Sequence, residues 1–253
     1  MLALKVLILA VLQGVAEFLP ISSSGHLVIG RDFLGLEDAG MRLDLMLHVG
    51  TLVSIFAFYR KTIVRILVNF EWLYVLKILA SAVPAVIVYF CFHDFVDGLF
   101  SNTRMVGALL MFTGAVLIGT RYLPRGTKDI GFGRALLMGL GQALAILPGV
   151  SRSGMTLASA RSGQTDPEKA AEFSFLMSAP LILGGMLLDL LKGDVAAEAC
   201  GLGWTELLTG AAVAAVVGYA ALALLVKALK GKWFWLFGPY CLATGLGVLV
   251  FAK

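Results

Sequence analysis

The stretch QGVAEFLPISSSGH at residues 13–26 decides the fold of this chain, because it interrupts a long apolar segment with polar groups. A second stretch, QALAILPGVSRSGM at residues 142–155, resembles the first. Their alignment pairs identical residues: Gln13 with Gln142, Ala16 with Ala145, Ser22 with Ser151, Ser24 with Ser153 and Gly25 with Gly154. Paired interruptions in the two halves of a membrane protein indicate a binding site near the middle of the bilayer.

The two stretches differ at the positions that carry the most reactive side chains. The differing pairs are Glu17 with Ile146, Ser23 with Arg152 and His26 with Met155. One stretch therefore supplies an acid and an imidazole, and the other supplies a guanidinium.

The composition is that of an integral membrane protein. Of the 253 residues, 59% are hydrophobic and 14% are charged, and the mean hydropathy is +0.92. A soluble domain carries about 25% charged residues. The net charge of +4 comes from basic residues in short loops rather than from one basic stripe, so we expect no nucleic-acid partner.

Six apolar segments are long enough to cross a hydrocarbon core of about 30 Å. They are residues 43–59, 73–92, 105–122, 171–191, 207–226 and 233–251. Two further segments, 2–19 and 135–147, run into a proline and a serine–glycine cluster and resume at 27–33 and 156–160. Irregular backbone is tolerated at membrane depth only where protein or a wet cavity shields it, so we predict two re-entrant helix–loop–helix hairpins.

These elements predict an all-α polytopic membrane protein with a single membrane domain over residues 1–253. The domain consists of six transmembrane helices and the two re-entrant hairpins, divided between repeats at about 1–125 and 126–253. Because each half has an odd number of spans, the two repeats are inverted relative to each other.

Basic residues in short loops predict the orientation, since such loops stay in the cytoplasm. The more basic set of loops contains Arg60, Lys61, Arg65, Arg121, Arg125, Lys128, Arg134, Lys169, Lys227, Lys230 and Lys232. The other set contains Arg31, Arg42, Arg104 and Lys192 among several acidic residues. We therefore expect the first set in the cytoplasm, both termini outside, and the 13–26 hairpin entering from outside.

Glu17 is the only carboxylate between Met1 and Gly30. An ionisable group inside a membrane costs about 2.5–3.5 kcal/mol on insertion scales and is a functional candidate by default. Gln13 lies four residues earlier, on the same helical face. Together they can hold a divalent cation or orient a water. The structural alternative is a hydrogen bond that fixes the hairpin.

The cluster Ser22-Ser23-Ser24-Gly25-His26 follows Pro20, where we expect a helix to begin. Serines at such a start cap the helix, and free N–H groups there bind anions. His26 is a candidate nucleophile or acid/base. Capping serines and a structural histidine are the alternatives.

The tip of the second hairpin surrounds Arg152 with groups that hydrogen-bond phosphate. These groups are Ser151, Ser153, Thr156 and the backbone around Gly149. A guanidinium suits bidentate contact with phosphate. Arg152 can also neutralise Glu17, and the two roles are compatible.

We predict structural roles for three polar residues outside the two hairpins. His48 follows Asp44 by four residues at the entrance to a span and has no other polar neighbours in the sequence, so we interpret it as structural. Glu172 and Ser174 open the span after the second hairpin, and we expect them to support that hairpin from behind.

These residues resemble the signatures of a known family, the bacterial undecaprenyl-diphosphate phosphatases of the bacitracin-resistance type. The matching stretches are residues 13–26, 148–156 and 172–176, and the resemblance extends over the whole chain in length, order and repeat. It implies removal of one phosphate from undecaprenyl diphosphate at the outer face of the bacterial plasma membrane. That reaction recycles the carrier lipid for cell-wall synthesis and confers bacitracin resistance.

The resemblance also implies roles for individual residues and a divalent cation, Ca²⁺ or Mg²⁺. Glu17 corresponds to the acidic catalytic or metal-linked residue, Ser23 and His26 to candidate nucleophile and acid/base, and Arg152 to the group that holds the diphosphate. Gln13 departs from the family, in which many members have glutamate there. Metal binding would therefore depend more on Glu17 and on the phosphates of the substrate.

Several alternatives remain at the level of sequence. Inverted repeats with broken helices are also the architecture of transporters, so a lipid-phosphate transporter or flippase is the competing function. The attacking group is His26, Ser23 or a water. Small residues at 184, 185 and 210–212 pack helices within one chain or in a homodimer.

Overall fold

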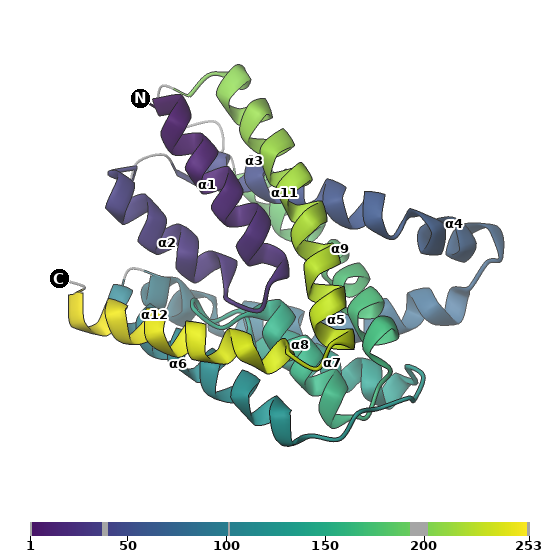
Figure 1. Cartoon of the computed structure of the whole chain (residues 1–253). Helices are drawn as coiled ribbons and strands as arrows, with labels where there is room; N and C mark the ends of the chain where they lie inside the picture. Colours follow the sequence, from purple (N-terminus) through teal and green to yellow (C-terminus); the bar gives the residue numbers. More distant parts are fainter. Residues whose placement is uncertain (1, 37–39, 101, 193–201, 252–253) are drawn as a thin grey trace.

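A computed structural model of the chain describes residues 2–36, 40–100, 102–192 and 202–251 (Figure 1). Its helices are α1 Leu2–Phe18, α2 Ser23–Leu34, α3 Gly40–Phe58, α4 Arg60–Val68, α5 Trp72–Phe100, α6 Thr103–Gly119, α7 Phe132–Leu144, α8 Arg152–Ser162, α9 Pro167–Lys192, α11 Trp204–Lys230 and α12 Phe237–Phe251. Short 3₁₀ turns follow α6 at Thr120–Tyr122 and precede α12 at Phe234–Leu236. The described residues contain no β-strand, which confirms the all-α prediction.

Five helical segments are long and apolar enough to cross a membrane. They are Trp72–Phe92, Thr103–Tyr122, Pro167–Leu188, Trp204–Lys230 and Phe234–Phe251. Each overlaps one of the six predicted spans, so the chain is a multi-pass membrane protein. The remaining predicted span, 43–59, coincides with α3, which is not among the five and carries Arg42 and Asp44 in its first turns.

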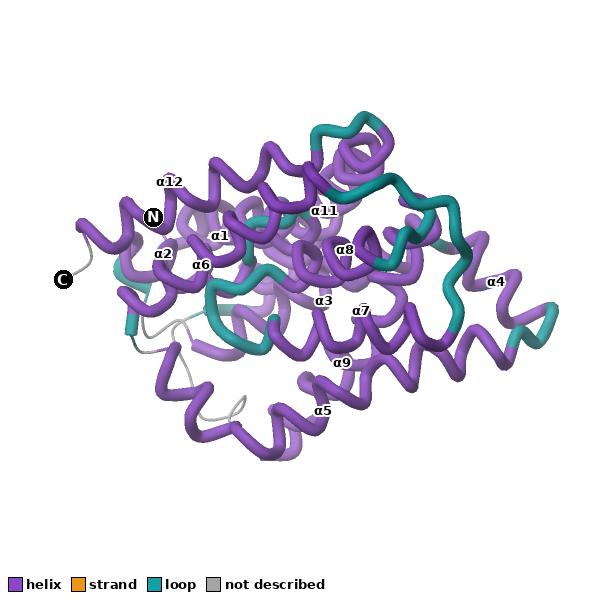
Figure 2. The backbone as a smooth tube through the Cα atoms, turned by 90° about the horizontal axis from the view of Figure 1, so that it is seen from below, coloured by secondary structure: helices purple, strands orange, loops and turns teal. Residues whose placement is uncertain are grey.

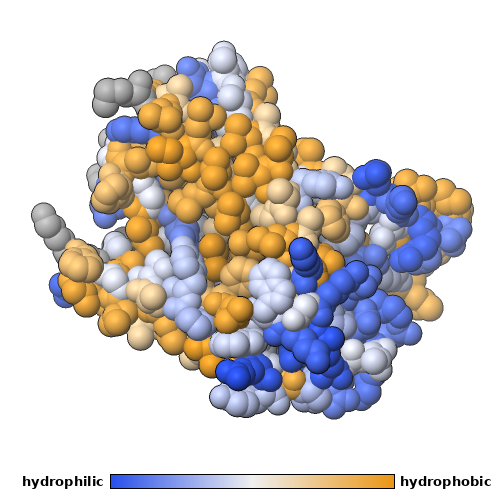
Figure 3. Space-filling view, viewed as in Figure 1, coloured by the Kyte–Doolittle hydropathy of each residue, from blue (hydrophilic) through white to orange (hydrophobic). Residues whose placement is uncertain are grey.

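The outer surface is apolar along the helices and hydrophilic at one end. Figure 3 shows a hydrophobic face over α1 and α11 and a hydrophilic region beside α4. Leu4 and Ile8 of α1 and Leu208 and Val216 of α11 are among its exposed side chains. Large exposed apolar surfaces are the rule where lipid, rather than water, is the solvent.

The two interrupted segments form helix–turn–helix hairpins, α1–α2 and α7–α8, whose tips point toward each other in the middle of the molecule (Figure 1). The breaks are shorter than predicted, because Ser23, Ser24 and Gly25 already belong to the first turn of α2. Each hairpin packs its first arm against a helix of the opposite half, α1 against α11 and α7 against α5.

Helices α6 and α12 form the closest helix pair, and glycines let their backbones touch. A Cβ atom on Gly107 would lie 3.0 Å from the Gly245 carbonyl oxygen, and one on Gly114 would lie 2.7 Å from that of Gly238. The pairing is reciprocal: the earlier glycine of each helix faces the later glycine of the other. This pairing means that α6 and α12 run antiparallel to each other.

The basic loops gather at the end of the molecule that carries α4, opposite the start of α1 and the end of α12 (Figures 1 and 2). Arg125 donates to the backbone oxygen of Lys230, and the Lys230 ammonium lies 2.6 Å from Glu168 Oε1. Residues 60–68, expected to be a loop, form α4. This helix exposes Val64 and Leu67 beside its basic residues, the pattern of a helix that lies in the membrane interface.

Candidate active site

The site begins where the tips of the two hairpins meet. Glu17 lies in the last turn of α1 and Arg152 in the first turn of α8. Arg152 Nη2 donates to Glu17 Oε1, and the Glu17 side chain is only 6% exposed. Each charge therefore has its counter-charge in the opposite half of the chain, which lowers the cost of burying both in a membrane protein.

Three further groups approach the other carboxylate oxygen, Glu17 Oε2. Ser23 Oγ donates to it at 2.7 Å, and Gln13 Nε2 donates to it at 3.2 Å. The Nε2 atom of His48, on α3, lies 3.8 Å from the same oxygen. The structure thus brings Gln13, Glu17, Ser23 and Arg152 together, as predicted from the two stretches, and adds a histidine that was interpreted as structural.

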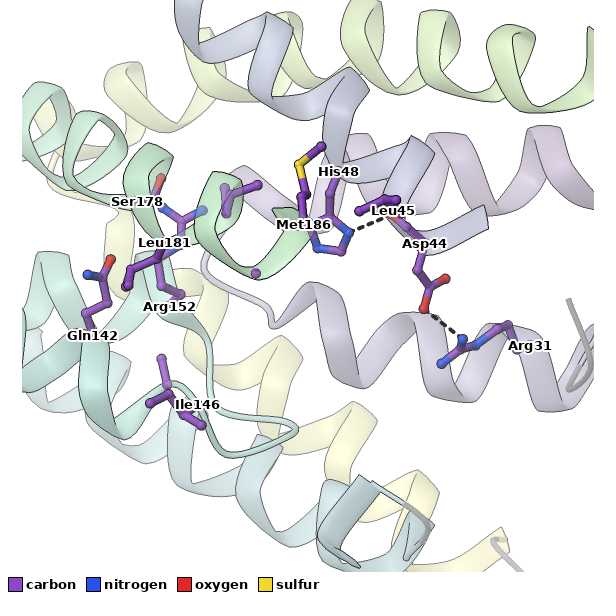
Figure 4. Close-up of a pocket in the computed structure, with 13 residues that line it drawn as sticks. Arg31, Asp44, Leu45, His48, Gln142, Ile146, Arg152, Ser178, Leu181 and Met186 are labelled. Atoms are coloured by element: carbon purple, nitrogen blue, oxygen red, sulfur yellow. Dashed lines mark hydrogen bonds and ion pairs between the residues drawn. The ribbon is translucent and has the colours of Figure 1, made fainter. Parts of the chain in front are cut away.

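A cavity of about 560 Å³ opens beside this cluster, between α2, α3, α7, α8 and α9 (Figure 4). Its polar lining residues are Arg31, Asp44, His48, Gln142, Arg152 and Ser178. The rest of the lining is mainly aliphatic and comes from α3, α9 and the end of α7. Gln142 and Arg152 lie at one end in Figure 4, and the Arg31–Asp44 ion pair of 2.7 Å lies at the other.

Two of the hydrogen-bond donors that line this cavity have buried polar atoms with no hydrogen-bond partner among the described residues. They are Arg152, through Nη1, and Gln142, through both atoms of its amide. Unsatisfied buried donors are costly, and native sites retain them where a ligand completes the hydrogen bonds. The Arg152 guanidinium lies 5.6 Å from the Phe175 ring centre, which holds the planar group in place. These donors suit an anionic ligand.

The serines of both tips act as helix caps. Ser22 Oγ accepts from Gly25 N at 3.4 Å, and Ser151 Oγ accepts from Gly154 N at 3.1 Å. Ser24 pairs with Ser22, and Ser153 with Ser151. These serines do not line the cavity, and neither do Gln13, Glu17 and Ser23, so their predicted substrate contacts remain a prediction.

Thr156 and Gly149 also lie outside the cavity lining and shape the tip of the second hairpin. Thr156 Oγ1 is 2.6 Å from Ser174 Oγ, so the expected support from Ser174 is confirmed. Gly149 has a φ of +93°, and its carbonyl oxygen accepts from Thr113. Glu172 does not contribute to this support.

Glu172 instead accepts hydrogen bonds from Thr62 and Tyr74, at 2.7 and 3.3 Å, at the basic end of the molecule. It lines a second, larger cavity of about 800 Å³ there. The expectation for Glu172 was wrong because α9 turns its side chain away from the hairpin while Ser174, two residues later, faces the hairpin.

His26 lies apart from the cavity. Its Nδ1 atom is 2.9 Å from the Ser22 carbonyl oxygen, which only accepts, so Nδ1 donates. Its Nε2 atom then accepts from the Tyr240 hydroxyl at 2.8 Å, and the two rings stack. Both ring nitrogens are therefore engaged, and the side chain is buried.

No group of three or more His, Cys, Asp or Glu side chains that could hold a metal occurs among the residues the structure describes. The two predicted metal ligands, Gln13 and Glu17, nevertheless lie side by side, within 3.2 Å of each other. The buried Gln13 Oε1 atom has no hydrogen-bond partner within the described part of the chain, and an amide oxygen is a good ligand for Ca²⁺ or Mg²⁺.

The family model described as "Bacitracin resistance protein BacA" matches residues 6–247, which include both hairpins of the site. The chain belongs to this family. A Desulforapulum autotrophicum protein named undecaprenyl-diphosphatase is 37% identical, with 94% of each chain covered. Bacillus cereus undecaprenyl-diphosphatase 4 is 37% identical over 98% of this chain and 95% of its own. The Halothermothrix orenii undecaprenyl-diphosphatase is 36% identical over 98% and 97%.

Proposed function

We propose that this protein hydrolyses undecaprenyl diphosphate to undecaprenyl phosphate and inorganic phosphate. Its membership of the BacA family and the names of its relatives support this activity. The structural observation that carries the proposal is the Arg152 guanidinium, which is held by Glu17 through one arm and has its other buried arm unpartnered beside the cavity. In this role the enzyme recycles the carrier lipid for the cell wall and confers bacitracin resistance.

The diphosphate head group occupies the cavity, and its prenyl tail leaves toward the lipid. Arg152 Nη1 and the Gln142 amide donate to the terminal phosphate, and the guanidinium of Arg152 neutralises the charge that spreads over its oxygens during transfer. The aliphatic side chains of Leu181 and Met186 contact the first prenyl units. A concave site with a few convergent polar groups on an apolar lining is the usual form of a small-molecule site.

Ser23 attacks the terminal phosphorus, and Glu17 accepts the hydroxyl proton. The anhydride bond breaks, undecaprenyl phosphate leaves, and a water then hydrolyses the phosphoserine to release phosphate. The 2.7 Å hydrogen bond from Ser23 Oγ to Glu17 supports this assignment. Engagement of both His26 nitrogens, by Ser22 and Tyr240, favours a positioning role for His26 over attack.

A divalent cation, Ca²⁺ or Mg²⁺, completes the site, with Glu17 and Gln13 as the residues that hold it. Such an ion supplies further charge neutralisation on the diphosphate oxygens. Glu17 and the unpartnered Gln13 Oε1 support the placement.

The chain crosses the membrane six times, with α3 as the sixth span, and the two hairpins are re-entrant arms of inverted repeats. The reciprocal contacts between α6 and α12 support the inversion. The basic end with α4 faces the cytoplasm, both termini lie outside, and the site opens to the outer side of the bacterial plasma membrane. The clustering of basic residues at one end supports this orientation.

A lipid-phosphate transporter with the same architecture is the alternative function, and the names of the relatives do not favour it. The assembly we propose is a homodimer. Gly210 packs against Val6 and Leu47 within the chain, whereas a Cβ atom on Gly184 would meet no atom within 4 Å among the described residues, which leaves room for a partner helix.

The direct test is phosphate release from undecaprenyl diphosphate and farnesyl diphosphate by detergent-purified protein, with and without a chelator. Arg152→Ala is expected to abolish release. Arg60→Ala, which removes an exposed guanidinium on α4, is the matched control and is expected to keep it. No release from folded wild-type protein would refute the phosphatase and favour the transporter.

A further inference from the structure

His48 has a defined tautomer if its ring is neutral. Its Nδ1 atom lies 2.7 Å from the Asp44 carbonyl oxygen, one turn earlier on α3. A carbonyl oxygen only accepts hydrogen bonds, so Nδ1 carries the hydrogen. The Nε2 atom of the neutral ring therefore has an exposed lone pair.

That lone pair faces a second acceptor. Nε2 is 3.8 Å from Glu17 Oε2, so two electron-rich atoms confront each other beside the cavity. A third is close by, because the Gln13 amide contacts the same Glu17 oxygen at 3.2 Å and leaves its own Oε1 buried and without a partner among the described residues. Rotation of the amide by about 180° about its terminal torsion exchanges Oε1 for Nε2 at little cost in shape.

We propose that His48 is a ligand of the divalent cation, through Nε2, together with Glu17 Oε2 and Gln13 Oε1. The proposal deepens the proposed function and depends on the cation of that site. Oxygens of the diphosphate and water complete the coordination. Once the Gln13 amide has turned, a cation between the three acceptors binds all of them.

The measured separation fits a shared ion. Nitrogen and oxygen ligands lie about 2.1 Å from Mg²⁺ or Zn²⁺, so two ligands of one ion are at most about 4.2 Å apart. The 3.8 Å between His48 Nε2 and Glu17 Oε2 lies within this limit. The hydrogen bond from Nδ1 to the Asp44 carbonyl is also the arrangement that usually orients a metal-binding imidazole.

The arrangement assigns separate tasks to the two oxygens of one carboxylate. Glu17 Oε1 holds Arg152, and Glu17 Oε2, the oxygen that also accepts from Ser23, holds the cation. Both positive groups then lie next to the cavity, where the diphosphate binds. An imidazole ligand also biases the choice of ion, since it suits transition metals better than Ca²⁺. We therefore expect Mn²⁺ to bind more tightly than Ca²⁺.

Pulsed electron paramagnetic resonance of bound Mn²⁺ tests the proposal. Detergent-purified full-length protein is loaded with Mn²⁺ in the presence of methylenediphosphonate, a diphosphate that resists hydrolysis. The expected result is nitrogen modulation from a directly bound imidazole in the wild-type protein. His48→Gln is expected to lose that modulation and to bind Mn²⁺ about tenfold or more weakly.

His26→Gln is the matched control, because both nitrogens of His26 already have partners, Ser22 and Tyr240. It is expected to retain the modulation. Bound Mn²⁺ without modulation, or modulation that persists in His48→Gln, would overturn the proposal and leave His48 as a charged partner of Glu17. Phosphate release by the same samples tests the phosphatase separately, so release without modulation overturns only the role of His48.

Discussion

The two terminal nitrogens of the Arg152 guanidinium have different roles, and a substitution at this position can distinguish them. One arm, Nη2, pairs with Glu17, and the other, Nη1, is buried and unpartnered among the described residues. Arg152→Lys keeps the positive charge, but an ammonium is a single point donor without the planar fork. We expect the lysine to retain the contact with Glu17 and to lose the contact with phosphate.

The expected loss of activity in Arg152→Lys can be calculated from the single hydrogen bond to phosphate that the lysine does not make. A hydrogen bond to a charged group contributes about 1.5–3 kcal/mol. At about 1.4 kcal/mol for each factor of ten, kcat/KM of Arg152→Lys should fall by about 10- to 100-fold while the protein remains folded. Arg152→Ala removes both arms and leaves Glu17 buried without its guanidinium. That change should lower the free energy of unfolding by about 3–5 kcal/mol and abolish turnover.

The assay is phosphate release at several substrate concentrations, with thermal unfolding in the same detergent as the measure of folding. Arg60→Lys on the exposed face of α4 controls for a general effect of the exchange. A kcat/KM of Arg152→Lys equal to that of the wild type would refute the reasoning, because it would mean that Arg152 Nη1 does not contact the phosphate. Equal loss of unfolding temperature in the lysine and alanine variants would refute the claim that lysine retains the Glu17 pair.

The other predictions concern residues around that pair. Ser23→Ala should lower kcat more than about a thousandfold and abolish the phosphoserine detected by mass spectrometry after rapid quenching, whereas activity within tenfold of wild type would mean that water attacks. Gln142→Leu should raise KM about 5- to 10-fold. It should keep or raise the unfolding temperature, because it removes two buried polar atoms that have no hydrogen-bond partner among the described residues. An unchanged KM would exclude Gln142 from the phosphate site. Gly149→Ala should cost about 2 kcal/mol or more of stability, measured by thermal unfolding, since φ is +93° and its Cβ would lie 2.4 Å from the Val106 carbonyl oxygen.

The sequence predicted the central pair because its two copies carry complementary charges. An unpaired Glu17 in one apolar hairpin and an unpaired Arg152 in the other would each raise the free energy of membrane insertion. An ion pair between them lowers that free energy for both. The same reasoning predicted the hairpins, since a proline followed by a cluster of Ser and Gly disfavours one uninterrupted helix. These inferences need only local sequence and the properties of the bilayer.

The sequence could not predict contacts that depend on how separate helices are rotated about their axes. His48 and Glu17 lie on separate helices, and only the packing of α3 beside the hairpin brings them within 3.8 Å. His26 pairs with Tyr240, which is 214 residues away in the chain. Gln142 was recognised as the counterpart of Gln13, but its position on the cavity depends on where α7 ends. The sequence carried no signal for this role of His48, because its Nδ1 bonds the backbone carbonyl of Asp44, which any residue at that position would supply.

The asymmetry between the two hairpins explains how a repeated fold can hold one site. Two identical tips would bring like charges together, and the repulsion would separate the hairpins. Here the first tip provides the carboxylate and the second provides the guanidinium, so the pair stabilises the contact between the halves. The substrate need not break that pair, because Arg152 has a second arm at the cavity. The same ion pair therefore joins the two halves and keeps the phosphate-binding group oriented before the substrate arrives, which lowers the cost of organising the site during catalysis.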